Sequence, residues 1–276
     1  MLKRLLTVLR LKRSELRSKV RRTILGPHAA GVLVENAQGL FLAAPDDISV
    51  GWQLTQHGTY GLEILEVLEP LITKQSNVLV AGAHIGSIAI PLAKKAANVT
   101  AFEANPKTFH LLELNKRLND SGNLIVHPLA LGSSSGMLKF LLNSANSGGS
   151  KRVPLHKGDY YHDKPQVIEV PMVALDEFMP DAAFDVILMD IEGSEPDALR
   201  GMQRILKTTQ HLLVEYLPHH LDHVAGVTDD EFVSLLSPHF NRVHLAGNPA
   251  GESRDLAAFV KNIRNTLSGG DLLFSK

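Results

Sequence analysis

The sequence predicts an α/β fold built around a parallel sheet that helices cover on both faces. From residue 78 onward, strand-like apolar runs alternate with segments of helical spacing. The strand-like runs are apolar throughout, which is typical of strands buried on both faces. A length of 276 residues suits one such domain with an appendage better than two full domains.

Each element follows from its local pattern. Two short apolar runs joined by Asn-Ala-Gln-Gly predict a hairpin over residues 31–44, and the leucine spacing over residues 62–72 predicts a helix. Ser194 and Asp197 have the spacing of a capping box for a helix that begins at residue 195. The alternation predicts strands at 78–81, 99–102, 124–126, 137–142, 167–170, 184–189, 211–214, 240–245 and 271–274. It predicts further helices at 87–97, 106–118, 195–206 and 229–236.

Composition and charge narrow the class of protein. The chain has no cysteine, which excludes disulfides, thiolate metal sites and cysteine nucleophiles and fits a cytoplasmic location. Residues 1–22 hold nine Lys or Arg against one Glu, a net charge of +8, whereas the rest carries −9. The leucines among them form one helical stripe, so this basic helix either packs on its own domain or lies at the inner face of an anionic membrane. No basic face is evident elsewhere, which argues against a nucleic-acid partner.

Residues 143–165 form the longest predicted connection. They are rich in Ser, Gly, Lys, His and Tyr. A connection of this length is either a lid or a mobile segment. Aromatic faces pack on sugar rings while polar side chains reach hydroxyl groups, so the composition suits a lid over a sugar acceptor.

The first strand ends in a turn that points to a nucleoside ligand. Gly82 and Gly86 bound this turn, and a glycine lets backbone come close to a ligand. Glu103 follows the next strand, where a carboxylate can accept hydrogen bonds from a ribose diol. The glycine patterns that bind dinucleotides or ATP phosphates are absent. A ligand with ribose and an amino-acid tail but no phosphate fits this turn, namely S-adenosylmethionine.

Several motifs then resemble one known family. "VLVAGAHIG", "FEANPKTFHLLELNKRLN", "LALGSSSGMLKF", "VALDEF" and above all "FDVILMDIEGSEPDALRGMQRIL" are similar, in order and spacing, to the FkbM-type S-adenosylmethionine-dependent methyltransferases. The resemblance implies a doubly wound, mostly parallel seven-stranded Rossmann-like sheet with one antiparallel edge strand. It implies a methyltransferase domain over residues 61–276, preceded by an extension over residues 1–60 with the basic helix and the hairpin. It also implies O-methylation of a hydroxyl on a sugar, glycan or polyketide-like small molecule.

The resemblance also assigns a cofactor site. Carried over by position, this site comprises Gly82, Ala83, His84, Gly86, Glu103, Ala104, Asn105 and Ala130. The family's first strand usually ends in Asp-Val-Gly-Ala-Asn, whereas this chain has Val80, Ala81, Gly82, Ala83 and His84. The acidic group that helps to hold the methionine end of the cofactor is therefore absent from this strand. We expect His84, at the start of a helix and near a sulfonium, to be a neutral imidazole.

The acceptor side of the site needs a base, because a hydroxyl must lose its proton to become a nucleophile. Asp190 and Glu192 follow the most apolar strand and are the candidate catalytic residues, and Asp190 could instead contact the tail of the cofactor. Glu215, His219 and Tyr60 are candidate contacts of the acceptor. His219 and His223 have the spacing to share a metal on a helix, but no third ligand is matched to them, so no metal is expected.

Two other functions stay open from the sequence. Because the first strand lacks its usual Asp, the chain is compatible with a module that binds S-adenosylmethionine without catalysis. A nicotinamide-dependent oxidoreductase is a weaker alternative, because the phosphate-binding turn is absent.

Overall fold

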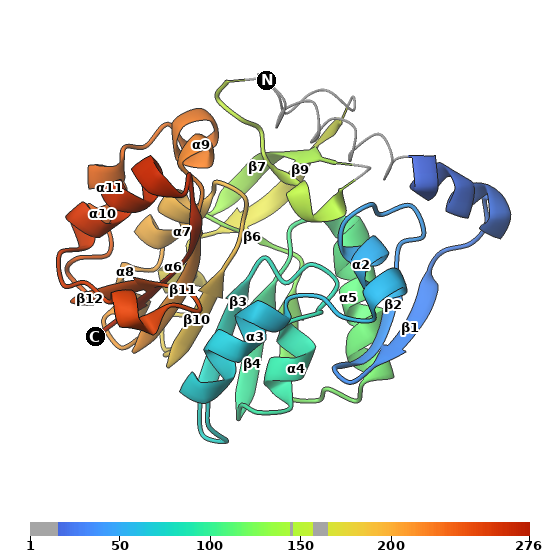
Figure 1. The fold of residues 1–276 in the computed structure, drawn as a ribbon, viewed down its shortest axis with the longest axis horizontal. Helices are drawn as coiled ribbons and strands as arrows, with labels where there is room; N and C mark the ends of the chain where they lie inside the picture. Colours follow the sequence, from blue (N-terminus) through green and yellow to red (C-terminus); the bar gives the residue numbers. More distant parts are fainter. Residues whose placement is uncertain (1–15, 144–145, 157–164) are drawn as a thin grey trace.

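A seven-stranded sheet forms the centre of the protein in a computed structural model that describes residues 16–143, 146–156 and 165–276. Its strand order is β12-β13-β11-β10-β3-β4-β5. Figure 1 shows these strands with helices packed around them. The strands are β3 (Asn77–Ala81), β4 (Asn98–Phe102), β5 (Leu124–His127), β10 (Val186–Met189), β11 (His211–Tyr216), β12 (Arg242–Leu245) and β13 (Gly270–Ser275).

The sheet is parallel except for β13, which is antiparallel to both of its neighbours. The expected seven-stranded, mostly parallel sheet is confirmed. The antiparallel strand, however, is not the edge strand. β12 lies outside it, because the chain reaches the sheet edge first and then returns as β13 between β12 and β11.

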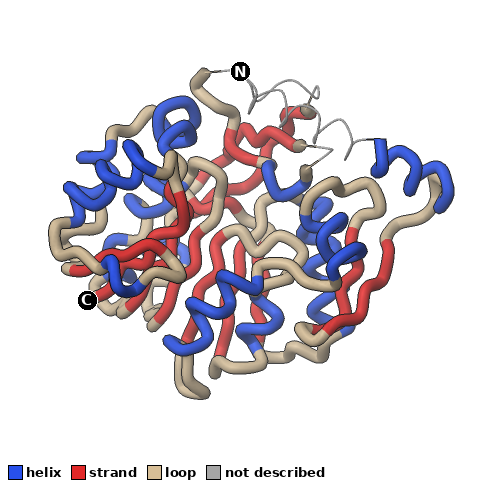
Figure 2. Tube along the Cα trace, viewed as in Figure 1, coloured by secondary structure: helices blue, strands red, loops and turns tan. Residues whose placement is uncertain are grey.

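Helices cover both faces of the sheet (Figure 2). Alternate strand residues enter two separate hydrophobic clusters, since successive side chains of a strand point to opposite faces. Leu79 and Ile187 pack with the helices of one face, whereas Val80 and Leu188 pack with those of the other. The first face carries α6 (Leu175–Phe178), α7 (Glu195–Arg200), α8 (Gln203–Leu206), α10 (Asp229–Ser234) and α11 (Leu256–Thr266). The second carries α2 (Val50–His57), α3 (Leu62–Leu68), α4 (Ala89–Ala93) and α5 (Pro106–Leu118).

Some boundaries differ from those expected. The helix over 87–97 is only α4, because Pro91 and the turns on either side leave one short α-helical stretch. The helix over 62–72 ends at Leu68 and continues as a 3₁₀ turn, Glu69–Leu71. α2 and α11 were not expected. In α11, Leu256, Val260 and Ile263 are buried at helical spacing, and Asp255 caps the first turn by accepting from the N–H of Ala258.

A second sheet is inserted between β5 and β10 and lies above the central sheet in the view of Figure 1. The strands expected at 137–142 and 167–170 are both present and pair with each other. Part of the expected lid, 157–164 with 144–145, lies outside the described residues. The insertion sheet comprises β6 (Ala130–Leu131), β7 (Gly136–Leu142), β8 (Lys151–Arg152) and β9 (Gln166–Val173).

The expected hairpin is confirmed as β1 (Val32–Asn36) and β2 (Gly39–Ala43). β2 is tied to α5 because the side-chain amides of Asn115 and Asn119 bond the backbone of Leu42 and Leu40. Residues of β2 and α2 share one hydrophobic cluster with the central sheet.

Residues 1–15 of the predicted basic helix lie outside the described residues. Residues 16–25 are helical. The guanidinium groups of Arg17 and Arg21 lie 4.9 and 5.1 Å from the ring centroid of Trp52, and Ser18 donates to the carbonyl of Asp46. Residues 16–25 therefore pack on the rest of the domain, which is one of the two arrangements expected for the basic helix. Among the described helices, none combines the length and the apolar character that crossing a membrane requires.

Candidate active site

A cavity of about 280 Å³ opens at the carboxyl ends of β3, β4, β10 and β11. This is the edge at which open α/β sheets bind ligands. The N-terminal extension and the insertion sheet contribute to its walls. Ten of the sequence-predicted residues line it, namely Tyr60, Gly82, Ala83, His84, Glu103, Ala104, Ala130, Asp190, Glu192 and Glu215. Gly86, Asn105 and His219 are not among its lining residues.

The glycine turn after β3 is shaped first by contacts within the protein. Gly82 has φ +86°, and a Cβ on it would lie 1.7 Å from the carbonyl oxygen of Asp190. The N–H groups of Gly82 and Ala83 both donate to the carbonyl of Phe102. Gly86 has φ +89°, and a Cβ there would lie 2.8 Å from Leu112. The glycines thus let β3 approach β10 and α5, and only Gly82 also lines the cavity.

Glu103 is held in one orientation at the end of β4. Its Oε2 accepts the N–H of His84 at 2.8 Å, and its Oε1 accepts the N–H of Asn105 at 2.7 Å and the hydroxyl of Thr108 at 2.9 Å. The residue is 9% exposed, and it lines the cavity. Because each carboxylate oxygen has two lone pairs, Oε2 keeps capacity for a further donor. Asn105 has a structural task, since its side chain caps α5 through the N–H of Lys107.

His84 connects the glycine turn to the wall above it. Its backbone has φ +51°, and its Nε2 lies 2.7 Å from the hydroxyl of Ser147. The carboxylate of Asp47 accepts hydrogen bonds from both the hydroxyl and the N–H of Ser147. The extension, the insertion and the turn after β3 are therefore joined by one chain of hydrogen bonds. The neutral state expected for His84 stays a prediction.

The segment after β10 is organised by Glu195. Its carboxylate accepts the N–H of Ile191 and the N–H of Gly193, both at 2.9 Å, and it is fully buried. Burial raises its pKa to about 7. The capping box expected from Ser194 and Asp197 is wrong, because the side chain of Ser194 makes no capping hydrogen bond.

Four acidic residues converge where β10, β11 and β13 meet the cavity. Asp190 has an exposed side chain in the cavity, but protein surrounds it on all other sides. Desolvation, and then the charge of nearby Glu192, raise its pKa well above the ordinary value. Desolvation and then Asp190 raise the pKa of Glu215 to about 11. Burial likewise raises the pKa of Asp271. Carboxyl groups this close cannot all be ionised, so the set holds protons near neutral pH.

Tyr60 lies at the same cavity, contributed by the extension. Burial and then the charge of Asp190 raise the pKa of its phenol. The phenol therefore keeps its proton and can donate a hydrogen bond to a ligand.

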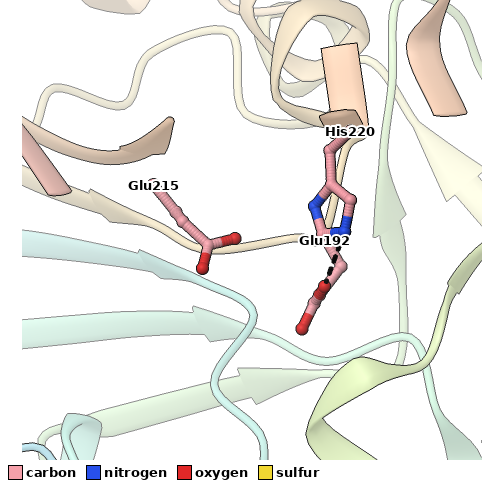
Figure 3. A group of neighbouring side chains, drawn as sticks. All are labelled: Glu192, Glu215 and His220. Atoms are coloured by element: carbon pink, nitrogen blue, oxygen red, sulfur yellow. Dashed lines mark ion pairs between the residues drawn. The ribbon is translucent and has the colours of Figure 1, made fainter. Parts of the chain in front are cut away.

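The structure groups different histidines from those expected. Atoms of Glu192, Glu215 and His220 lie within 4.8 Å of one another, a residue set that could hold a metal ion (Figure 3). His219 is exposed beside the His220 ring, whereas His223 contacts the ring of His156. Neither His219 nor His223 belongs to this set.

Sequence reasoning did not assign roles to Lys151, Asp271 and Ser147. Lys151 is buried and its ammonium lies 2.8 Å from Oε2 of Glu192. Its place in a polar insertion gave no signal of burial. Asp271 stands in a recognised strand, and its position next to β11 could have indicated that it faces the same edge.

Comparisons with known proteins identify the family of this chain. The Methyltransferase FkbM domain matches residues 81–244. Because the match covers more than half of the chain, this protein belongs to the FkbM methyltransferase family.

Individual relatives are more distant. The hexuronic acid methyltransferase AglP of Haloferax volcanii is 30% identical over 159 residues, which are 56% of this chain and 59% of AglP. The match thus spans less than two thirds of that relative. Among solved structures, methyltransferase FkbM from Methylobacillus flagellatus KT has a TM-score of 0.47 at 17% identity, covering 74% of this chain and 44% of that chain. TYW2 of M. jannaschii in complex with AdoMet has a TM-score of 0.46 at 13% identity, covering 91% and 87%.

Proposed function

We propose that this methyltransferase uses S-adenosylmethionine to methylate a hydroxyl group of a sugar or glycan. The observation that carries the proposal is the rigid Glu103 carboxylate on one side of the cavity and the acidic set on the other. The Glu103 carboxylate suits a ribose diol. The acidic set suits the positive charges of the cofactor and can take the proton that an acceptor hydroxyl loses. FkbM family membership and the likeness to a hexuronic acid methyltransferase support this assignment.

The residues present fit the cofactor. The free lone pair on Oε2 of Glu103 would accept a ribose hydroxyl. Ala104, Leu129 and Phe140 offer an apolar wall of the cavity to the adenine. Asp190 would take the role of the missing acid at Val80, because a bound methionine ammonium favours the ionised form of a nearby carboxyl. When bound, S-adenosylmethionine supplies an electrophilic methyl group on a sulfonium, which needs little help to leave.

The protein's own task is to hold the acceptor and take its proton. The acceptor oxygen would lose its proton to the Glu192 carboxylate as its bond to the methyl carbon forms. Bound S-adenosylmethionine would supply the methyl group, and its sulfur would keep the electron pair of the methyl–sulfur bond. Glu215, which holds a proton, would donate a hydrogen bond to a neighbouring hydroxyl of the sugar. Positioning of this kind is the main source of rate for an in-line methyl transfer.

Calorimetry with S-adenosylmethionine and with NADH tests the cofactor. We expect binding of S-adenosylmethionine, competition by S-adenosylhomocysteine, and no binding of NADH. Mass spectrometry of 4-nitrophenyl glucoside and glucuronide after incubation tests the acceptor class, with an increase of one methyl group as the expected product. Binding of NADH alone would refute the cofactor assignment.

One observation favours a second candidate, a module that binds the cofactor without catalysis. Val80 is fully apolar and buried where relatives usually have Asp, so part of the cofactor's usual support is absent. Tight binding of S-adenosylmethionine without methyl transfer to any sugar tested would favour this candidate.

A further inference from the structure

A lysine from the insertion sheet lies inside the cluster of Glu192, Glu215 and His220. The Lys151 ammonium is 2.8 Å from Oε2 of Glu192 and 3.2 Å from Nε2 of His220. Lys151 is only 4% exposed. A buried ammonium is costly unless it is paired, so these contacts fix where the side chain lies.

The geometry around Lys151 shows which group is the cation of the cluster. An ammonium can only donate, so Nε2 of His220 accepts from Lys151 and the imidazole is neutral. Nε2 of His220 nevertheless lies 3.5 Å from Oε2 of Glu192 (Figure 3). Two acceptors come this close because they share one donor, the Lys151 ammonium. It therefore supplies the positive charge between two of the three residues that could hold a metal ion.

The insertion strand directs two cations to the segment after β10. Lys151 and Arg152 are successive residues of β8, so their side chains leave the strand on opposite sides. Lys151 pairs with Glu192, and Arg152 pairs with Asp197 of α7 at 3.6 Å. Only Lys151 contacts a carboxylate that lines the cavity, so Arg152 is a matched control.

We propose that Lys151 is a positioning residue that keeps Glu192 ionised and turned toward the cavity, in place of a metal ion, and so selects Glu192 as the base. This inference rests on the proposed methyl transfer. Lys151 does not line the cavity and acts through Glu192. Without it, Glu192 would share protons with the other groups that face this region. Among the residues that the structure describes, those groups include Tyr60, Asp190, Glu195, Glu215, His219, His220 and Asp271.

The pH dependence of kcat/KM tests the inference in wild type, Lys151→Met, Lys151→Arg and Arg152→Met. Loss of the ammonium favours the protonated carboxyl, so Lys151→Met should move the acidic limb to higher pH by about one unit or more. At pH values below the limb, kcat/KM would then be about tenfold lower than in wild type, and it would recover toward pH 9. Lys151→Arg should restore most of the wild-type profile, and Arg152→Met should match wild type. If Lys151→Met does not fold, Lys151→Gln gives the same comparison.

Three results would overturn the inference. The first is a Lys151→Met profile with an unchanged acidic limb. The second is an equal shift in Arg152→Met. The third is loss of wild-type activity on chelation with recovery in Mg²⁺ or Mn²⁺, which would make a metal ion the cation. Wild-type protein that binds no S-adenosylmethionine would instead refute the proposed function, whereas active wild type with an unshifted Lys151→Met refutes only the role of Lys151.

Discussion

The carbonyl oxygen of Asp190 occupies the space into which a side chain on Gly82 would project. The separation of 1.7 Å between that oxygen and a Cβ on Gly82 is far below any tolerated contact. The first turn of the sheet and the acidic segment after β10 thus lie in direct backbone contact. This contact therefore fixes the position of the turn after β3 relative to the segment that carries the candidate base, Glu192.

Gly82→Ala should disturb this relation severely. The new methyl group meets backbone that cannot move aside, and the φ of +86° is strained for alanine. We expect the free energy of unfolding to fall by about 3 kcal/mol or more in urea denaturation. Gly136→Ala is the control, because a Cβ there meets nothing within 4 Å and should change stability by less than about 1 kcal/mol. Equal stability of the two variants would contradict this account.

Glu103→Gln tests the ribose contact. The amide cannot replace both carboxylate oxygens, which accept from His84, Asn105 and Thr108. We expect the Kd for S-adenosylmethionine to rise about tenfold or more, as loss of one hydrogen bond to a charged group implies. Calorimetry measures it, with the exposed Glu66→Gln as the control. An unchanged Kd would remove Glu103 from the cofactor site.

The sequence predicted the strands that carry this site better than it predicted which charged side chains meet there. Buried strands are recognisable locally because their apolar runs carry the signal, as residues 78–81 and 184–189 show. Glu103 was found because the acid follows a strand in the primary sequence. Lys151 was not, since its burial depends on an insertion strand folding back onto the segment after β10. The helix of residues 256–266 was overlooked although its apolar spacing was present.

Glu195→Gln separates the observed turn from the expected capping box. The two carboxylate oxygens of Glu195 accept hydrogen bonds from the N–H groups of Ile191 and Gly193. In glutamine one of these oxygens is replaced by an NH₂ group, which is a donor, so one backbone N–H would lose its acceptor. We expect a loss of about 2 kcal/mol in unfolding free energy. Asp197→Asn removes the acid that the sequence pattern placed in the cap. Within the described part of the chain Asp197 forms one ion pair, with Arg152 at 3.6 Å, so the loss should be below about 1 kcal/mol. Chemical denaturation distinguishes the two, and the reverse order would restore the capping box.

The acidic set predicts that stability of the ligand-free protein falls as pH rises. The pKa of Glu215 is about 11 in the folded protein, against an ordinary value near 4.5. Between these values the folded state binds a proton that the unfolded state has released, so each unit of rising pH costs at most about 1.4 kcal/mol from this group. Glu215→Gln mimics the protonated form. Its advantage over wild type in urea denaturation should be small at pH 5 and grow toward pH 8, and an advantage that stays constant with pH would contradict the shift.

Ser147→Ala tests whether the wall above the glycine turn retains the cofactor. The Ser147 hydroxyl lies 2.7 Å from Nε2 of His84 and donates to Asp47, so it joins the insertion to the extension across the cavity. Loss of about 1 kcal/mol from this link corresponds to roughly a fivefold faster dissociation of S-adenosylmethionine. Stopped-flow displacement measures that rate, with Ser135→Ala as the control because its hydroxyl bonds only Glu177 at the surface. If both variants release the cofactor at the wild-type rate, the link between His84 and Asp47 supports the fold alone, since an intact cofactor site would then not depend on it.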